Sequence, residues 1–183
     1  MGQPKACLPF GEETMLQRIV RIVGAVCEET IVVAAAGQEC PSLPSTVTLV
    51  HDRVAGQGPL EGLDTGLAAL SSNPEFLYAT AADTPFLVPE WIARLRELIG
   101  PHDAAIPEVD DKLHPLAALY RTTPLIHEVN SLRRDNQRRL MLLATHLRTR
   151  FVTPDELRIV DPPLQSLRNI NFPEDYERAL RDL

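Results

Sequence analysis

The sequence predicts an α/β protein of three layers, with a mostly parallel sheet covered by helices on both faces. Strand-like and helical runs alternate along the chain. Residues 76–82 also form an apolar run without period-2 alternation, typical of a central strand covered on both sides. Thr84-Pro85 ends that run, because proline has no N–H for a ladder. Asp83 is therefore expected at the carboxyl end of a buried strand, where open α/β sheets bind ligands.

Asp83 has two interpretations. A carboxylate at such an edge is well sited to hold a divalent metal against phosphates. An aspartate before Thr-Pro is also ordinary turn or N-cap chemistry ahead of the helix that Pro89 opens. The choice between them depends on the rest of the chain.

The bulk composition limits the class of protein. The 183 residues fit one domain, 1–183, and 44% hydrophobic with 23% charged residues are those of a soluble globular protein. We find no apolar run long enough for a membrane and no leader, so we expect a cytoplasmic protein without a membrane partner. A net charge of −7 argues against a nucleic-acid surface. A phosphate ligand would therefore need a metal ion and a few local cations.

The cysteines and histidines carry little signal. The three cysteines are odd in number and widely spaced, which fits neither a disulfide framework nor a zinc site: Cys7, Cys27 and Cys40. The five histidines show no ligand spacing either. His114, before Pro115, is more typical of a hydrogen-bonded or exposed bystander than of a catalytic base.

The remaining elements follow from periodicity and from helix and turn signals. Residues 1–11 read as a loop, and Thr14 as the N-cap of the first helix. Further strands are expected at 30–36, 46–51, 103–109, 113–120 and 149–153, and further helices at 59–70, 89–99, 125–132, 138–147 and 173–183.

Two acidic residues follow strand-like runs, Asp52 and Asp83, and carboxyl ends of parallel strands share one edge of a sheet. The two could therefore face one ligand. Between them, the loop from Gly56 to Gly62 resembles the dinucleotide fingerprint but misses it, because the third glycine is late and Pro59 interrupts the turn. The backbone of this loop could approach a ligand closely, just before a helix that starts with proline. Alternatively, the loop is a tight strand-to-helix connection that needs glycine for its dihedral angles.

The charged cluster at residues 133–139 has two readings as well. It is typical of a solvated helix junction. Its functional reading is a basic patch for an anionic substrate.

Five motifs stand in one order: Met1-Gly2-x-Pro4-Lys5, Gly58-Pro59-Leu60-x-Gly62-Leu63, Ala82-Asp83-Thr84-Pro85, His114-Pro115 and Asn169-Ile170-Asn171-x-Pro173-Glu174-Asp175. Together they resemble the molybdenum cofactor guanylyltransferases, also called molybdopterin-guanine dinucleotide biosynthesis protein A, over nearly the whole chain. The resemblance implies a Rossmann-like fold of the nucleotide-diphospho-sugar-transferase type. It also implies transfer of GMP from GTP to the phosphate of molybdopterin, with release of pyrophosphate, and a transient contact with molybdenum cofactor insertion proteins.

The resemblance assigns residues as well. Lys5 matches a phosphate-contacting lysine, Asp52 a nucleotide-binding aspartate and Asp83 the Mg²⁺ ligand. The loop of Gly58, Pro59 and Leu60 matches a segment along the nucleoside. Positions near the pterin-side substrate correspond to His114, Asn169 and Asn171.

The reaction suits these residue types. One phosphate attacks another, and the nucleophile is already deprotonated near neutral pH, so no strong base is needed. Alignment and charge neutralisation by Mg²⁺, Asp83 and Lys5 would be enough.

One departure from the family is large. Its first strand and glycine-rich phosphate loop precede the lysine motif, and both are missing from this sequence, which indicates a start placed too far downstream or a truncation. Loss of a mid-sheet strand would expose ladder groups on both neighbours. A cytidylyltransferase acting on molybdopterin stays open, because nothing reads guanine directly and Ala35 stands near a position where the family often has a polar side chain. A non-catalytic nucleotide or cofactor-binding relative is the other alternative.

Overall fold

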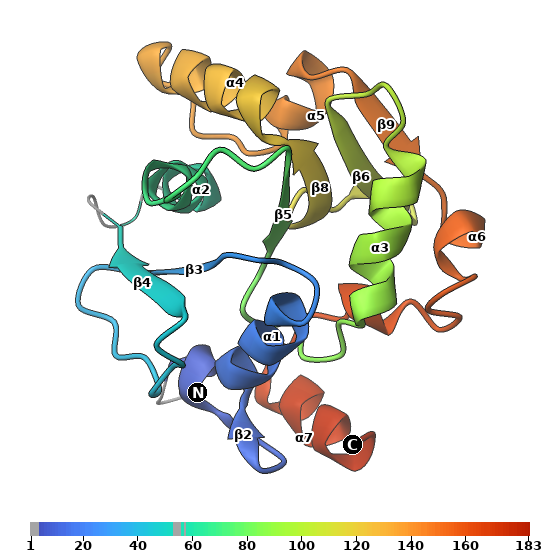
Figure 1. Ribbon diagram of the computed structural model, residues 1–183. Helices are drawn as coiled ribbons and strands as arrows, with labels where there is room; N and C mark the ends of the chain where they lie inside the picture. The colour runs from blue at the N-terminus through green and yellow to red at the C-terminus, as the bar shows by residue number, and fades with distance from the viewer. Residues whose placement is uncertain (1–3, 53–55, 57) are drawn as a thin grey trace.

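The computed structural model describes residues 4–52, 56 and 58–183 (Figure 1). Its helices are η1 (Lys5–Cys7), α1 (Met15–Gly24), α2 (Pro59–Ala68), α3 (Pro89–Leu98), α4 (Thr122–Arg134), α5 (Leu142–His146), α6 (Pro154–Leu157), η2 (Gln165–Leu167) and α7 (Pro173–Arg181). Its strands are β1 (Pro9–Phe10), β2 (Glu13–Thr14), β3 (Thr30–Ala34), β4 (Val47–His51), β5 (Phe76–Thr80), β6 (Ala104–Val109), β7 (Lys112–Leu113), β8 (Ala117–Arg121) and β9 (Thr149–Val152).

The larger sheet has the order β5-β8-β6-β7, with β9 paired to β6. Strand β8 is antiparallel to both β5 and β6, so β5 and β6 run in the same direction, and β9 is parallel to β6. Strands β3 and β4 form a separate parallel pair. The carboxyl ends of β5 and β6 therefore lie at the same edge, together with the amino end of β8.

Alternating residues of the sheet divide the core into two halves. Ala104 and Ile106 of β6 pack with residues of α2, α4 and α5 on one face. Ala105 of the same strand packs with α1 and α3 on the other face. Helices thus cover both faces of the larger sheet, as Figure 1 shows, and the predicted three-layer α/β fold is confirmed.

Local signals account for several element boundaries. Thr14 caps α1 through a capping box with Gln17, as its sequence position predicts. Pro59 and Pro89 occupy the first turns of α2 and α3, where a missing N–H costs nothing. The β6-β7 hairpin turns through Asp110 and Asp111, both with positive φ.

The loop predicted for residues 1–11 is wrong for its described part. Lys5–Cys7 forms η1, and Pro9–Phe10 pairs with Glu13–Thr14 in a small hairpin that turns at Gly11. Phe10 explains this order, because its side chain is fully buried in a cluster with Phe86 and Ile170. Residues 1–3 lie outside the described residues.

Strand β5 also differs from its prediction. It ends at Thr80, and within the described residues it pairs only with β8, so it lies at the edge of the larger sheet rather than in its centre. No strand of the described ranges joins β5 to the β3-β4 pair.

We find no helix in residues 4–52, 56 and 58–183 with the length and apolar character needed to cross a lipid bilayer.

Candidate active site

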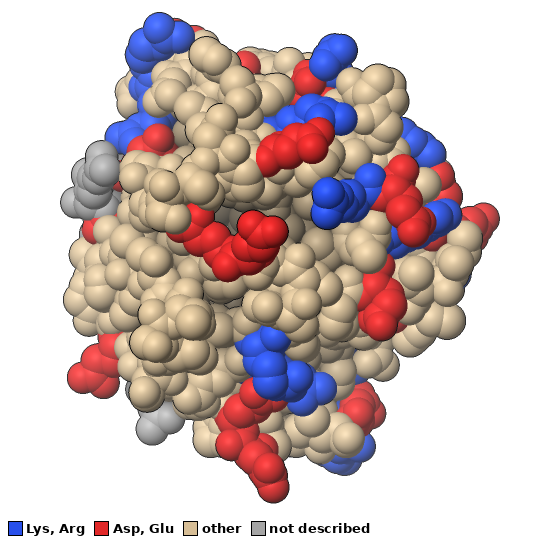
Figure 2. Space-filling view, viewed as in Figure 1, with Lys and Arg blue, Asp and Glu red and all other residues tan. Residues whose placement is uncertain are grey.

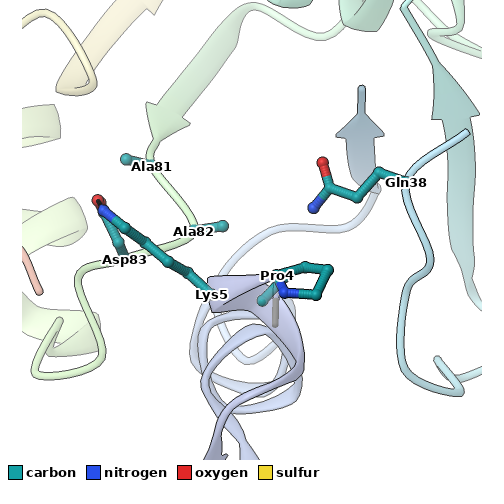
Figure 3. A pocket seen from close by; sticks show the side chains of 7 residues that line it. Pro4, Lys5, Gln38, Ala81, Ala82 and Asp83 are labelled. Atoms are coloured by element: carbon teal, nitrogen blue, oxygen red, sulfur yellow. Dashed lines mark hydrogen bonds and ion pairs between the residues drawn. The ribbon is translucent and has the colours of Figure 1, made fainter. Parts of the chain in front are cut away.

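A cavity of about 500 Å³ lies where the chain leaves β3 and β5 and meets the N-terminal η1 helix. Its lining is small and mostly apolar, with three polar side chains among seven residues: Pro4, Lys5, Ala6, Gln38, Ala81, Ala82 and Asp83. In Figure 3, the Lys5 side chain reaches toward Asp83 on one side of the cavity and Gln38 faces them from the other. The site is largely open to solvent, and its polar side chains come from three separate segments of the chain.

The loop after β5 holds Asp83 in place. The buried Thr84 hydroxyl donates to the Ala81 carbonyl at 3.2 Å, which closes the turn around Asp83. The Asp83 carbonyl accepts the Ile170 N–H at 2.8 Å, and the Pro85 carbonyl accepts from Arg18 at 2.7 Å. The Asp83 carboxylate is thus presented by a fixed backbone at the carboxyl end of β5.

Lys5 is anchored through its neighbour. Ala6 is buried against Leu16 and Val20 of α1, which fixes η1 on that helix. From there the Lys5 ammonium donates to Asp83 Oδ2 at 3.3 Å and to Asn171 Oδ1 at 2.7 Å. Lys5, Asp83 and Asn171 therefore meet around one ammonium group, although they lie up to 166 positions apart in the sequence.

Asn171 is positioned by the start of α7. The Asp175 carboxylate accepts the backbone N–H groups of Asn171 and Phe172 at 3.3 and 3.0 Å. These hydrogen bonds, that to Phe172 above all, hold the pKa of Asp175 below its ordinary value. Asp175, the last residue of the fifth sequence motif, thus fixes the backbone of Asn171, whose side chain accepts the hydrogen bond from Lys5.

The donor set around Asp83 fits a magnesium ion. Asp83 Oδ1 is buried and has no hydrogen-bond partner among the described residues. No group of three or more His, Cys, Asp or Glu side chains in the described ranges could hold a metal. Magnesium commonly takes one or two carboxylates and completes its octahedron with water and substrate phosphates, so a single free carboxylate oxygen suffices.

Asp52 is not among the residues that line the cavity. Its N–H donates to the Ala34 carbonyl at 2.8 Å, which places it at the carboxyl end of β3. Burial and the nearby Glu61 raise the pKa of the Asp52 carboxyl. Oδ1 of Asp52 is buried, without a described partner, and faces Gly62 of α2. Arg53, which follows Asp52, is outside the described residues.

The loop before α2 offers backbone more than side chains. Gly58 has a φ of 79° and is followed by Pro59 at the first turn of α2. The Leu60 side chain is 2% exposed and packs in the core, so only its main chain could approach a nucleoside. Within this loop, residue 57 lies outside the described residues, as do Met1 and Gly2 of the lysine motif.

His114 and Asn169 lie near this edge without lining the cavity. The His114 carbonyl accepts the N–H of Ala117, which pairs with Thr80 of β5, so His114 belongs to the same end of the sheet as Asp83. Its pKa is lowered, first by burial and then by Lys112, while Asp110 opposes the shift. Asn169 is exposed beside Ile170, whose N–H bonds to Asp83.

Two features were missed by sequence reasoning. Gln38 lines the cavity, whereas the sequence predicted functional residues only at Asp52 and Asp83 among those that follow strands. The signal for Gln38 was Gly37, the turn residue directly before it. Arg133 of the charged cluster pairs with Glu61 at 3.5 Å and with Asp64, both on α2. Neither reading of the cluster anticipated this helix-to-helix contact.

Figure 2 shows no continuous basic surface on the face it presents. Basic and acidic side chains are interspersed around its edge, and acidic ones border a hollow near its middle. This face has the mixed character expected from the net charge of −7.

The architecture and the site define a class, the nucleotidyltransferase type of α/β fold, as two solved structures indicate. Molybdopterin-guanine dinucleotide biosynthesis protein A from Archaeoglobus fulgidus superposes with a TM-score of 0.78 at 21% identity, covering 99% of this chain and 91% of that one. The 2-C-methyl-D-erythritol 4-phosphate cytidylyltransferase from Thermus thermophilus gives 0.75 at 18% identity, with 97% and 93% covered. At these identities, the likeness shows the fold alone.

The family follows from sequence. Residues 1–149 match the model of the MobA-like NTP transferase domain, and the chain belongs to that family. A probable molybdenum cofactor guanylyltransferase of Mycobacterium marinum is 34% identical over 185 aligned positions, covering 99% of this chain and 87% of the relative. The resemblance read from the five motifs is thus confirmed, and with it an enzyme of the nucleotidyltransferase class in molybdenum cofactor biosynthesis.

Proposed function

We propose that the protein transfers GMP from GTP to the terminal phosphate of molybdopterin in a Mg²⁺-dependent reaction that releases pyrophosphate. The observation that carries the proposal is the Lys5-Asp83 pair at the cavity, where a long cationic side chain and a free carboxylate oxygen lie side by side. The relative from Mycobacterium marinum is named for guanylyl transfer, and the solved relative from Archaeoglobus fulgidus for the guanine dinucleotide of molybdopterin.

Lys5 would act on the phosphates. Its ammonium is held between Asp83 and Asn171, and its side chain lines the cavity and is 37% exposed, so it can contact an α-phosphate or the departing pyrophosphate. A preorganised cation at that point offsets the charge that gathers as two anions meet. Asn171 accepts from Lys5 and fixes its direction.

Asp83 would hold the metal through Oδ1. The bound ion would supply charge neutralisation at the phosphate oxygens and help align them. A Mycobacterium tuberculosis protein of the same fold has been solved in complex with manganese, at a TM-score of 0.67 and 14% identity. Magnesium as the working ion is part of the present proposal.

The other assigned residues complete the substrate contacts in this proposal. Asp52 and the Gly58-Pro59-Leu60 loop would border the nucleotide. His114 and Asn169 would lie toward the pterin-side substrate. A lowered His114 pKa keeps its ring neutral near pH 7, so it would bind by hydrogen bonding rather than by charge.

The test is pyrophosphate release with GTP, molybdopterin and Mg²⁺. We expect Asp83→Asn, which keeps the size but removes the charge, to lower kcat by roughly a hundred- to a thousand-fold. The matched control is Asp155→Asn, whose side chain is 93% exposed and forms an ion pair with the nearby Arg158. Asp83→Asn with wild-type kcat would refute the metal role.

CTP in place of GTP separates the remaining candidates. Faster pyrophosphate release with CTP would replace guanylyl by cytidylyl transfer. Nucleotide binding without any pyrophosphate release, in wild-type protein with all substrates present, would contradict the proposed reaction.

A further inference from the structure

Among the described residues of the cavity lining, Gln38 is the one neutral polar side chain, and it lies opposite the Lys5-Asp83 pair (Figure 3). Cation and carboxylate on one side suit phosphates and a metal. Gln38 offers a neutral amide across from them, while the Pro4 ring beside Lys5 and the Ala82 methyl group beside Asp83 add apolar lining that suits a flat heterocycle. The two sides therefore differ in the ligand chemistry that each can accept.

The Gln38 amide has a fixed orientation. Its Oε1 accepts the Ala35 N–H at 3.2 Å, and its own backbone N–H donates to the Ala35 carbonyl at 3.0 Å. Gly37, with a φ of 75°, supplies the positive dihedral that this turn needs. Because a backbone N–H can only pair with the oxygen of the side-chain amide, the Nε2 group is left to face the cavity.

Nε2 is a donor without an acceptor. No hydrogen bond from it to another residue is found within 4–52, 56 and 58–183. The group is half-buried, so a ligand that excludes water there must offer it a lone pair.

We infer that Gln38 determines base specificity by donating from Nε2 to a carbonyl oxygen of the nucleotide base. Guanine presents O6 and N7 as adjacent acceptors, whereas adenine presents a donor amine at the position of O6. The orientation of Gln38 therefore favours GTP over ATP. This inference rests on the proposed function, because it assumes that a nucleotide occupies the cavity.

The test compares nucleotides by affinity and by kcat/KM in the full chain. We expect Gln38→Leu to weaken GTP about tenfold while ATP changes little, since one neutral hydrogen bond is lost. In Gln38→Glu, the new carboxylate should repel O6 and accept from the adenine amine, so the GTP-to-ATP ratio should fall further. A general effect of the added charge would weaken both nucleotides alike and leave the ratio unchanged.

A double-mutant cycle isolates the contact. The triphosphate of 2-aminopurine riboside lacks O6, so it should bind wild-type protein about as weakly as GTP binds Gln38→Leu, and the variant should not weaken it further. Gln137→Glu, an exposed site after α4, is the matched control for charge. Melting temperatures of all variants show whether each remains folded.

The outcomes separate this inference from the proposed function. An unchanged GTP-to-ATP affinity ratio in both folded Gln38 variants overturns it, whatever the activity. Tight GTP binding that Gln38→Leu weakens selectively supports it even if pyrophosphate release fails. If the Gln38 variants lose CTP binding selectively, cytosine would replace guanine in the proposed function. Gln38 would still be supported as the donor to a base carbonyl.

Discussion

Asp103 illustrates how a single carboxylate is fixed when its partner remains in solvent. Its side chain is 12% exposed and accepts from the Arg148 guanidinium twice, at 2.7 and 2.8 Å, and from the Arg148 N–H at 3.2 Å. Together these contacts tie the start of β6 to the residue before β9. The guanidinium hydrogen bonds lower the pKa of Asp103 below its ordinary value.

The pH dependence of stability follows from that direction. A lowered pKa in the folded state means that the stabilisation is complete above the ordinary carboxyl pKa of about 4 and is lost as pH falls through the lower folded value. We expect Asp103→Asn to lose about 1 to 2 kcal/mol of unfolding free energy at pH 7 and much less near pH 2, with Arg148 mostly exposed. Urea unfolding at both pH values measures this. An equal loss at both would contradict the ionic origin.

At the scale of elements, the turn after β3 shows how one glycine supports the side chain that faces the cavity. Gly37 holds a φ of 75°, which L residues rarely adopt, while a Cβ added there would have no atom of a described, non-adjacent residue within 4 Å. A side chain there meets no neighbour, so any cost is that of the backbone dihedral alone.

We expect Gly37→Ala to destabilise the protein by about 1 kcal/mol and to displace the Gln38 amide, because the alanine disfavours the turn. Gly24→Ala is the matched control. Gly24 ends α1 without a positive φ, and its added methyl would be in ordinary contact with Thr30, so a neutral or slightly stabilising effect is expected. Thermal unfolding of the two variants makes the comparison. Similar melting temperatures for both would show that the turn does not require glycine.

For the molecule as a whole, Trp91 joins a helical layer to the larger sheet. The side chain is fully buried between α3 and the face of the sheet that carries Ala105 and Leu119. Its indole N–H donates to the Ala117 carbonyl at 3.3 Å, at the first residue of β8. The contact lies at the same end of the sheet as His114 and the Asp83 loop, so packing and site share one support.

Trp91→Ala should cost about 3 to 5 kcal/mol of unfolding free energy, because it leaves a large cavity. Trp91→Phe should cost less, since it keeps most of the apolar volume and loses the donor. Ile159→Ala, at a side chain 68% exposed, should change stability by less than about 0.5 kcal/mol. Equilibrium urea unfolding ranks the three variants. A Trp91→Ala variant as stable as Ile159→Ala would show that this layer contributes little.

The sequence by itself determined the elements whose signals are local. The N-cap at Thr14 and the prolines that open α2 and α3 act through neighbours along the chain, so their positions could be predicted directly. The order of five short motifs also indicated the family, because five motifs in one order are much more specific than any one of them alone.

Only the tertiary structure decided which side chains meet. Lys5, Asp83 and Asn171 are drawn together by the burial of Ala6 on α1 and by the hydrogen bond from Ile170 to Asp83, neither of which leaves a pattern in the sequence. The edge position of β5, the burial of Leu60 and the orientation of Gln38 likewise depend on long-range pairing and packing. Local propensity does not predict such contacts, because they depend on the free energy of the whole fold and not on adjacent residues.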